Sequence, residues 1–231
     1  MFFSTAQLFP ASVAYYFQEY ALIKVFFNTL LATFLCGFLL YILSATRKED
    51  LRTKDGFIIT VLFWTVLSIF GSFPLIFAEE IDISYIDALF ESISGLTTTG
   101  ATVLTGLDEL PRSILFYRQL LQWLGGMGII VLAVAVLPLL GIGGMQLYKA
   151  ETPGPLKDSK LTPRITETAK ALWYVYLTMT ILCASAYKLF GMTTYDAICH
   201  AFSTVSIGGF STHDESFGFF TQASIRWTSV I

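Results

Sequence analysis

Three long stretches without a charged residue constrain this chain more than any other feature of its sequence. They are Val25 to Leu43, Phe57 to Ala78 and Gln119 to Leu140. A helix needs roughly 20 residues to cross a hydrocarbon core about 30 Å thick, and each stretch is close to that length. A fourth stretch, Ala171 to Tyr187, is shorter and ends beside Lys188, whose amine can reach the interface. We therefore expect an all-α integral membrane protein.

Composition agrees with a membrane protein and argues against other classes. Of the 231 residues 55% are hydrophobic and 13% charged, with a mean hydropathy of +0.66, which is too apolar for an ordinary soluble domain. The net charge of −3 argues against a nucleic-acid partner, because phosphate binding requires a dense field of Lys and Arg. The cysteines Cys36, Cys183 and Cys199 lack disulfide or metal-ligand spacing, so we interpret them as packing residues.

Basic residues predict how the chain is oriented in the membrane. Nine of the fourteen lie in two polar connections: Arg47, Lys48, Arg52 and Lys54 in the first, and Lys149, Lys157, Lys160, Arg164 and Lys170 in the second. By the positive-inside rule both connections are cytoplasmic, so the two spans between them cross outward and back. The segment that joins those spans on the outside opens with three acids, Glu79, Glu80 and Asp82. Arg112 and Arg118 do not fit this charge bias.

The segment from Ser84 to Ala101 carries the functional signal. Ser84 followed by Asp87 is a helix start, and the run from Thr97 to Gly100 is a poor helix former that ends in a breaker. The helix between them, about 13 residues, reaches roughly 20 Å and cannot span. We expect a helix over 84–96 that dips into the membrane and stops. The loop behind it should line a cavity, because unpaired backbone groups at membrane depth cost several kcal/mol each.

The same arrangement recurs in the second half of the chain. Thr193 and Asp196 repeat the helix start, and the loop at 206–210 repeats the glycine loop, so that Gly100 pairs with Gly209. Letter identity between the segments is low, and the repeat rests on matched flanks: a span, a dipping helix, a glycine loop and a polar return. Repeated units that meet at an axis are how membrane proteins build sites near the midplane.

These loops suit a cation that sheds its water. Such an ion needs several oxygen dipoles at one radius, and backbone carbonyls supply them. Pointing successive carbonyls inward requires backbone angles that glycine adopts readily. We therefore interpret Gly100 and Gly209, one in each loop, as the residues that allow this conformation. Each dipping helix also aims the negative end of its dipole toward the membrane centre, which favours a cation.

Longer motifs carry a family resemblance from about Thr53 to the end of the chain. They are DGF at 55–57, ALFES at 88–92, LTTTGAT at 96–102, GLDELP at 106–111, RQLLQWLGGMG at 118–128, LPLLGIGGMQ at 137–146, TPRITETAKALW at 162–173 and FSTVSIGGFSTHD at 202–214. With these motifs the chain resembles the TrkH family, the potassium-translocating subunits of the Trk/Ktr/HKT superfamily. The region before Thr53 matches the family only in being apolar.

The resemblance implies a fold and a set of partners. It implies four repeats of transmembrane helix, re-entrant pore helix, filter loop and transmembrane helix, as in potassium channels, around one pore in the bacterial inner membrane. The transported substrate would be potassium, with no covalent cofactor. The implied partners are the lipid bilayer, a cytosolic nucleotide-binding regulatory subunit of the TrkA type and a second copy of the chain in a homodimer, with no nucleic acid.

Carried over by position, the first filter strand is Thr97 to Ala101 and the second is Ser206 to Phe210. The ion-binding residues that this implies are Thr97, Thr98, Thr99, Gly100, Ser206, Ile207, Gly208 and Gly209, with potassium held by the carbonyls of Thr98, Thr99, Ile207 and Gly208 in particular. No catalytic residue is implied.

The expected organisation has four parts. Residues 1–52 hold extra N-terminal helices, the first of them incomplete, and a cytoplasmic loop. Residues 53–147 form the first pore repeat, with its pore helix at 84–96 and filter at 97–101. Residues 148–170 are a cytoplasmic linker. Residues 171–231 are a truncated second repeat, with its pore helix at 193–205 and filter at 206–210. Met1 to Gln18 lacks a basic region and contains Pro10, which argues against a signal peptide.

Several residues admit a plainer interpretation. Gly125, Gly126 and Gly128 lie in a span with no preceding strand, which favours close helix packing over a nucleotide loop. His200 and His213 stand alone in the sequence, which argues against a metal site. Glu91 fits a carboxylate that braces the loop as well as one that shapes the outer field.

Two other functions are alternatives to uptake through a four-repeat pore. One is a two-repeat cation channel subunit that dimerises to complete the pore. The other is a membrane-embedded enzyme, which the spans disfavour because they are almost bare of ionisable groups. We expect a transporter and not an enzyme.

Overall fold

The computed structural model describes residues 2–44, 53–136 and 161–230, and these form helices and irregular segments without a strand. The helices, in chain order, are α1 (Phe2–Ala6), α2 (Leu8–Tyr16), α3 (Tyr20–Ser44), α4 (Thr53–Phe77), α5 (Tyr85–Leu96), η1 (Leu107–Glu109), α6 (Arg112–Val136), α8 (Leu161–Leu189), α9 (Thr194–Val205), η3 (Ser216–Phe219) and α10 (Ala223–Thr228).

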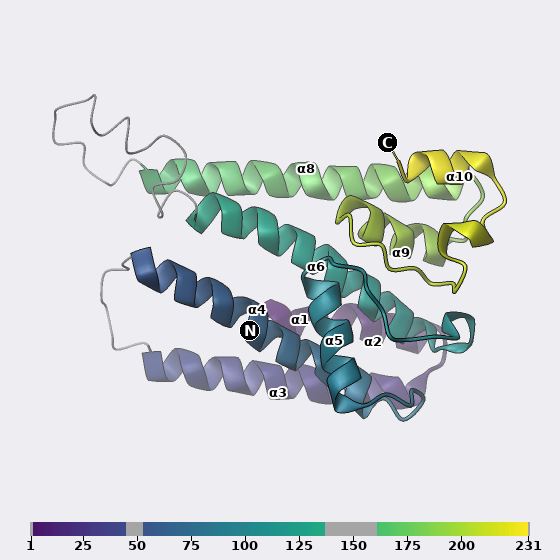
Figure 1. Cartoon of the computed structure of the whole chain (residues 1–231). Coiled ribbons are helices and arrows are strands. Elements are labelled where there is room, and N and C mark those ends of the chain that lie inside the picture. The colour runs from purple at the N-terminus through teal and green to yellow at the C-terminus, as the bar shows by residue number, and fades with distance from the viewer. Residues whose placement is uncertain (1, 45–52, 137–160, 231) are drawn as a thin grey trace.

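Four long helices, α3, α4, α6 and α8, run alongside one another, with α3 and α8 on opposite sides of the bundle (Figure 1). Among the described residues, three helical stretches are long and apolar enough to cross a membrane: Tyr20–Leu43, Thr60–Phe77 and Glu167–Leu189. They correspond to three of the four expected spans. The fourth, Gln119 to Leu140, extends beyond the described residues, and its described part belongs to α6, which begins at Arg112, ahead of the expected start at Gln119.

Two short helices, α5 and α9, tuck in beside the long ones (Figure 1). Helix α5 packs against α4 and α6, and α9 packs against α8 and α6. Each has 12 residues, so each is about 18 Å long at 1.5 Å per residue and too short to span a bilayer. We call α4 to α6 the first unit and α8 to α10 the second unit. Helix α6 contacts both short helices and therefore joins the two units.

The cytoplasmic linker expected at 148–170 stays a prediction, and the part of it that the structure describes is helical. Its last part, 161–170, belongs to α8, which runs from Leu161 to Leu189. Pro163 is compatible with this because it occupies the third helical position, where the missing amide proton would have had no partner within the helix. The part of the linker from 148 to 160 lies outside the described residues.

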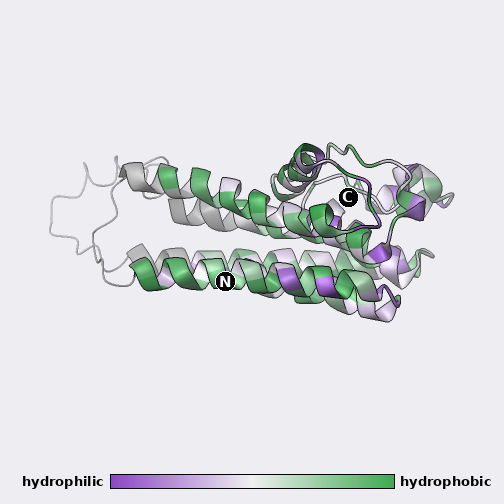
Figure 2. Cartoon of the chain, turned by 90° about the horizontal axis from the view of Figure 1, so that it is seen from below, coloured by the Kyte–Doolittle hydropathy of each residue, from purple (hydrophilic) through white to green (hydrophobic). Residues whose placement is uncertain are grey.

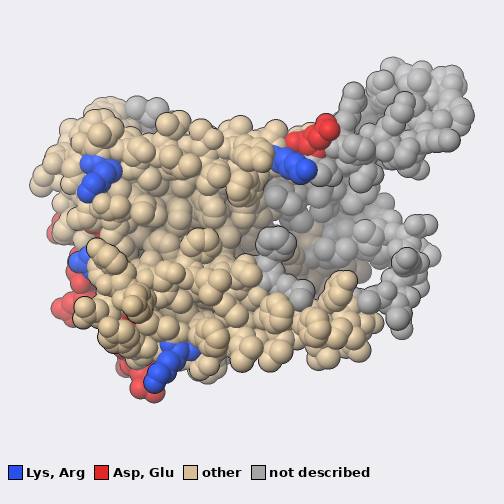
Figure 3. Space-filling view, turned by 180° about the vertical axis from the view of Figure 1, so that it is seen from behind, with Lys and Arg blue, Asp and Glu red and all other residues tan. Residues whose placement is uncertain are grey.

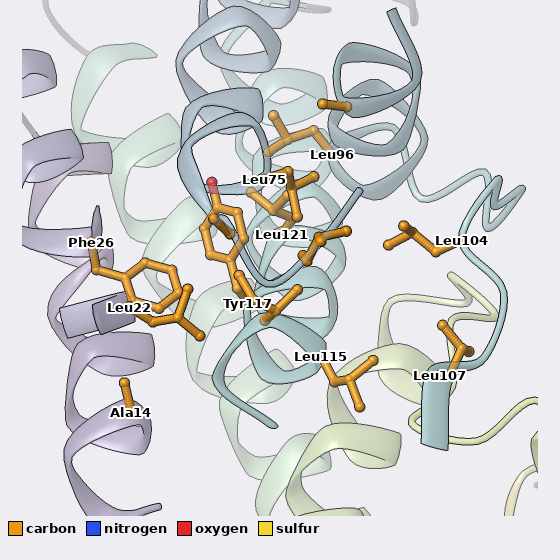
Figure 4. Packing of buried hydrophobic residues seen from close by; sticks show 14 residues of the cluster. Ala14, Leu22, Phe26, Leu75, Leu96, Leu104, Leu107, Leu115, Tyr117 and Leu121 are labelled. Atoms are coloured by element: carbon orange, nitrogen blue, oxygen red, sulfur yellow. The ribbon is translucent and has the colours of Figure 1, made fainter. Parts of the chain in front are cut away.

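A buried cluster joins the N-terminal helices to the first unit. Leu22 and Phe26 of α3 face Tyr117 and Leu121 of α6, and the cluster continues to Leu96 at the end of α5 (Figure 4). The cap of α6 comes from the same N-terminal region: the Glu19 carboxylate accepts hydrogen bonds from the amides of Arg112 at 2.8 Å and Ser113 at 3.0 Å. Helices that precede the repeats are thus part of their packing.

Hydrophobic residues cover the long helices, and polar residues gather toward the end of the bundle that holds the loops after α5 and α9 (Figure 2). Most of the acidic side chains visible in Figure 3 likewise gather at one end of the described bundle. A bundle with an apolar outer surface along its length and polar residues at its end is typical of a protein that crosses the hydrocarbon core of a membrane.

Candidate functional site: two matched loops behind short helices

Each short helix begins with the same reciprocal cap. The Ser84 hydroxyl accepts the amide of Asp87 at 3.2 Å and donates to its carboxylate at 2.7 Å. In α9 the Thr193 hydroxyl does the same with Asp196, at 3.1 and 2.6 Å. The cap satisfies an amide that would otherwise have no partner and places a carboxylate at the positive end of the helix dipole.

The two loops leave their helices through identical turns. In the first, the amides of Thr98 and Thr99 donate to the carbonyls of Gly95 and Ser94, at 3.0 and 2.9 Å. In the second, the amides of Ile207 and Gly208 donate to the carbonyls of Thr204 and Ser203, at 3.0 and 2.8 Å. Thr97 and Ser206 also match, since each hydroxyl donates to the carbonyl four residues earlier. The same three hydrogen bonds therefore recur at matched positions of the two loops.

Both loops adopt the left-handed backbone conformation at every second residue. The φ angles are +55° at Thr98 and +77° at Gly100, and +56° at Ile207 and +84° at Gly209. A β-branched residue such as Thr98 or Ile207 rarely adopts this conformation, so the surrounding structure must impose it. In an extended strand successive residues face opposite sides, and a left-handed residue at every second position breaks that alternation.

Carbonyl oxygens in both loops are left without a protein partner. Among the described residues, no hydrogen-bond donor reaches the carbonyls of Thr98, Thr99, Gly100, Ile207, Gly208 or Gly209. The loops also approach each other closely: a Cβ atom at Gly100 would lie 1.9 Å from the carbonyl oxygen of Gly208. Gly209 differs, because a Cβ atom there would meet nothing within 4 Å.

Helix α6 passes between the ends of the two short helices by means of two consecutive glycines. A Cβ atom at Gly125 would lie 1.9 Å from the carbonyl oxygen of Leu96, at the end of α5. One at Gly126 would lie 3.0 Å from the Cβ of Ser206, just beyond α9, and 2.6 Å from the Tyr176 hydroxyl. These glycines therefore serve close packing. Gly128 is less crowded, with its nearest neighbour at 3.6 Å.

A fully buried ion pair lies behind the first loop. Arg118 Nη2 lies 2.6 Å from Glu91 Oε1, and neither side chain is exposed to solvent. Glu91 also accepts the Thr102 hydroxyl at 2.9 Å and the Val103 amide at 3.1 Å. Of the two interpretations of Glu91, bracing of the loop is the one that this geometry supports. The pair also explains why Arg118 departs from the charge bias along the sequence: it neutralises a buried carboxylate.

Arg118 reaches the second loop as well. Its Nη1 lies 3.4 Å from the carbonyl oxygen of Ser211, and its guanidinium carbon lies 4.3 Å above the centre of the Phe210 ring. Gln122, one turn along α6, accepts the Phe210 amide at 3.2 Å. Arg112, the other exception to the bias, lies at the start of α6 with its guanidinium against the rings of Phe17 and Tyr195.

Behind the second loop a histidine stands where the first loop has a glutamate. When Gly100 is aligned with Gly209, Glu91 falls on His200 and Thr102 falls on Ser211. His200 is fully buried, and places Nε2 3.1 Å from the Ser211 hydroxyl and Nδ1 2.9 Å from the Asp196 carbonyl. This constant offset is the one signal in the sequence that could have paired these residues.

The outer ends of the two units are joined by Asp108 and His213. Their Oδ1 and Nδ1 atoms are 2.5 Å apart, and His213 Nε2 lies 3.5 Å from Asp196 Oδ1. The hydrogen bond from His213 lowers the pKa of the Asp108 carboxyl, and the Asp214 amide adds to the effect. His213, which stands alone in the sequence, therefore has a carboxylate partner that lies far away along the chain, in the first unit. No group of three His, Cys, Asp or Glu in the described part of the chain could hold a metal ion.

Comparisons with known proteins agree with this geometry. The family model for TrkH, described as cation transport protein, matches residues 22–231. A curated relative, "Trk system potassium uptake protein TrkH" of Vibrio parahaemolyticus, is 58% identical over 99% of this chain and 47% of its own length. The protein of the same name in Escherichia coli K12 is 54% identical over 97% of this chain, and the TrkG protein of that strain is 51% identical over 95%.

A solved structure matches over the same range. The crystal structure of the potassium transporter TrkH from V. parahaemolyticus has a TM-score of 0.87 and 53% identity, covering 99% of this chain and 45% of that one. The expected all-α membrane fold is thereby confirmed, and this chain spans about half the length of the relatives that it matches. The chain belongs to the TrkH family of cation transport proteins.

Proposed function

We propose that this chain forms part of a potassium uptake transporter and that the loops at 97–101 and 206–210 are two strands of its selectivity filter. Potassium is the substrate, and the carbonyls of Thr98, Thr99, Ile207 and Gly208 hold it. One observation carries the proposal: two loops related by the internal repeat share left-handed angles at matched positions, leave their carbonyls unpaired and meet at Gly100 and Gly208. Unpaired carbonyls at membrane depth are tolerated where an ion or water takes the place of a protein donor.

The open space at Gly209 supports a pore built from further repeats. Gly100 of the first loop faces Gly208 of the second, whereas Gly209 faces no protein atom within 4 Å. If the repeats follow one another around an axis, the strand of a third repeat faces Gly209. The relatives are about twice as long as this chain, so we propose that the same polypeptide supplies the remaining repeats. In the alternative, a second copy of a two-repeat subunit supplies them.

The partners follow from the family in the same way. We propose a location in the bacterial inner membrane, a cytosolic nucleotide-binding regulatory subunit of the TrkA type and a homodimeric assembly. The relatives are named as potassium uptake proteins, which supports the proposal that this chain serves transport and not catalysis.

The filter is tested by replacing Gly209 with alanine in the full-length protein. Alanine at a φ of +84° is strained, so the carbonyls beside it must move, and we expect a lower ratio of potassium to sodium flux in proteoliposomes. Gly106→Ala is the matched control: Gly106 has a φ of +67° and an equally open surrounding but lies in the outer loop before η1. An unchanged ion preference in Gly209→Ala would show that this loop is not part of the filter.

A further inference from the structure

We propose that Arg118 is a positioning residue that holds both filter loops in one geometry, so that ion preference depends on its forked guanidinium and not only on its charge. The inference rests on the proposed function, because it assigns a role at the same site.

The burial of Arg118 requires a specific reason. Both Arg118 and Glu91 have no exposed side-chain surface, and a buried ion pair contributes little to stability compared with apolar residues of the same shape. What such a pair offers is direction, since a guanidinium has five donors in a rigid plane. The groups that the Arg118 guanidinium contacts therefore explain why the pair is buried here.

Those groups belong to both loops. On one side Arg118 donates to Glu91 at 2.7 Å through Nε and to the Thr102 hydroxyl at 2.9 Å through Nη2. On the other side Nη1 reaches the Ser211 carbonyl, and the guanidinium covers the Phe210 ring. Thr102 is two residues beyond Gly100, and Phe210 directly follows Gly209. A shift of Arg118 thus moves the backbone next to both filter glycines.

The second unit has no such arginine of its own. By the offset that aligns Gly100 with Gly209, Arg118 corresponds to Trp227, which is 67% exposed, and Glu91 corresponds to His200, which has no carboxylate to pair with an arginine. One charged pair, placed at the boundary between the units, therefore serves two loops that the repeat would otherwise have braced separately.

The decisive variant is Arg118→Lys in the full-length protein. Lysine keeps the positive charge beside Glu91 but has a single ammonium group, which cannot reach the Thr102 hydroxyl and the Ser211 carbonyl in opposite directions. We expect the ratio of potassium to sodium flux in proteoliposomes to fall roughly tenfold, the change that corresponds to the loss of one hydrogen bond to a charged group. Arg112→Lys, on the same helix but away from both loops, is the matched control and should keep the wild-type ratio.

Hydrogen exchange measures the bracing without any ion flux. In Arg118→Lys, peptides that cover 101–103 and 210–212 should exchange faster, while those that cover the caps at Ser84 and Thr193 should keep their wild-type rates. Faster exchange in the first loop alone would overturn the claim that Arg118 serves both loops. A folded Arg118→Lys protein with the wild-type flux ratio would overturn the claim about ion preference.

A second variant decides the matter if Arg118→Lys does not fold. Phe210→Leu removes the ring beneath the guanidinium in the second loop and leaves Glu91 in place. Faster exchange at 101–103, in the first loop, supports the inference, and a wild-type rate there contradicts it. A wild-type protein that does not prefer potassium contradicts the proposed function instead, and the exchange measurement then still tests the bracing.

Discussion

Gly125 is the glycine with the least room for a side chain in the described part of α6. An added methyl group would lie 1.9 Å from the Leu96 carbonyl oxygen, which belongs to the backbone and cannot rotate away. For Gly125→Ala we expect a loss of stability of roughly 1–3 kcal/mol, the usual cost of overpacking, seen as a lower midpoint of thermal unfolding in detergent.

Gly128→Ala provides the comparison on the same helix. Its methyl group would make ordinary contacts with Phe63 and Trp64, at 3.6 and 3.7 Å, and alanine favours a helix by roughly 1 kcal/mol over glycine. We expect an unchanged or higher midpoint. Equal losses in the two variants would contradict the packing role given to Gly125.

Individual residues also show where sequence reasoning stops. The glycine loops at Gly100 and Gly209 were predictable because a breaker after a short helix is a local pattern. Arg118 was not, because its partners at 91 and 211 lie 27 and 93 residues away along the chain. The left-handed angles at Thr98 and Ile207 run against the preference of β-branched residues, so only the folded context reveals them.

At the scale of elements, the cap of each short helix can be tested alone. Ser84→Ala removes both hydrogen bonds of the cap with Asp87, which typically costs about 1 kcal/mol. We expect faster hydrogen exchange in the first turn of α5 and little change elsewhere. Thr105→Ala, an exposed threonine in the outer loop, is the control. Wild-type exchange in Ser84→Ala would mean that packing alone holds the start of α5.

The contact between the outer loops should depend on pH. Because the pKa of Asp108 is lowered in the folded protein, its contribution to stability is present above the usual value of about 3.9 and is lost as the pH falls through the lowered value. Asp108→Asn should therefore lower the unfolding midpoint at pH 7, and the difference from wild type should vanish in acid.

Two neighbouring groups also act on the contact between Asp108 and His213. His213 faces the Asp196 carboxylate as well as Asp108, and the Asp214 amide donates to Asp108 at 3.3 Å. Glu109→Gln is the control, since it removes an adjacent acid from η1 and leaves the contact in place. A difference between Asp108→Asn and wild type that does not change with pH would exclude the charge of Asp108 as its source.

The elements themselves were predicted well where their signals are local. The starts of α5 and α9 follow from Ser84 and Thr193, each with an aspartate three residues later. The starts of α6 and α8 were placed too late, at Gln119 and Ala171, whereas these helices begin at Arg112 and Leu161. Apolarity predicts where a helix meets hydrocarbon, but these helices continue beyond it through polar residues.

At the scale of the whole molecule, the charge distribution predicts which end faces the cytoplasm. Asp82 belongs to the acidic segment that follows α4, and Glu167 is the first residue of the apolar stretch of α8, next in sequence to the basic connection. In a background with the native cysteines replaced, Asp82→Cys should react with an impermeant maleimide added to intact cells. Glu167→Cys should react only after the membrane is opened. The reverse labelling would invert the topology.

The Glu19 cap of α6 has a consequence for the order in which the protein is made. The carboxylate that binds the amides of Arg112 and Ser113 comes from a segment translated well before α6. Because synthesis proceeds from the N-terminus, this acceptor is already in place when the start of α6 leaves the ribosome. A polypeptide that began after Glu19 would insert the same helix without this acceptor for the two amides at its start.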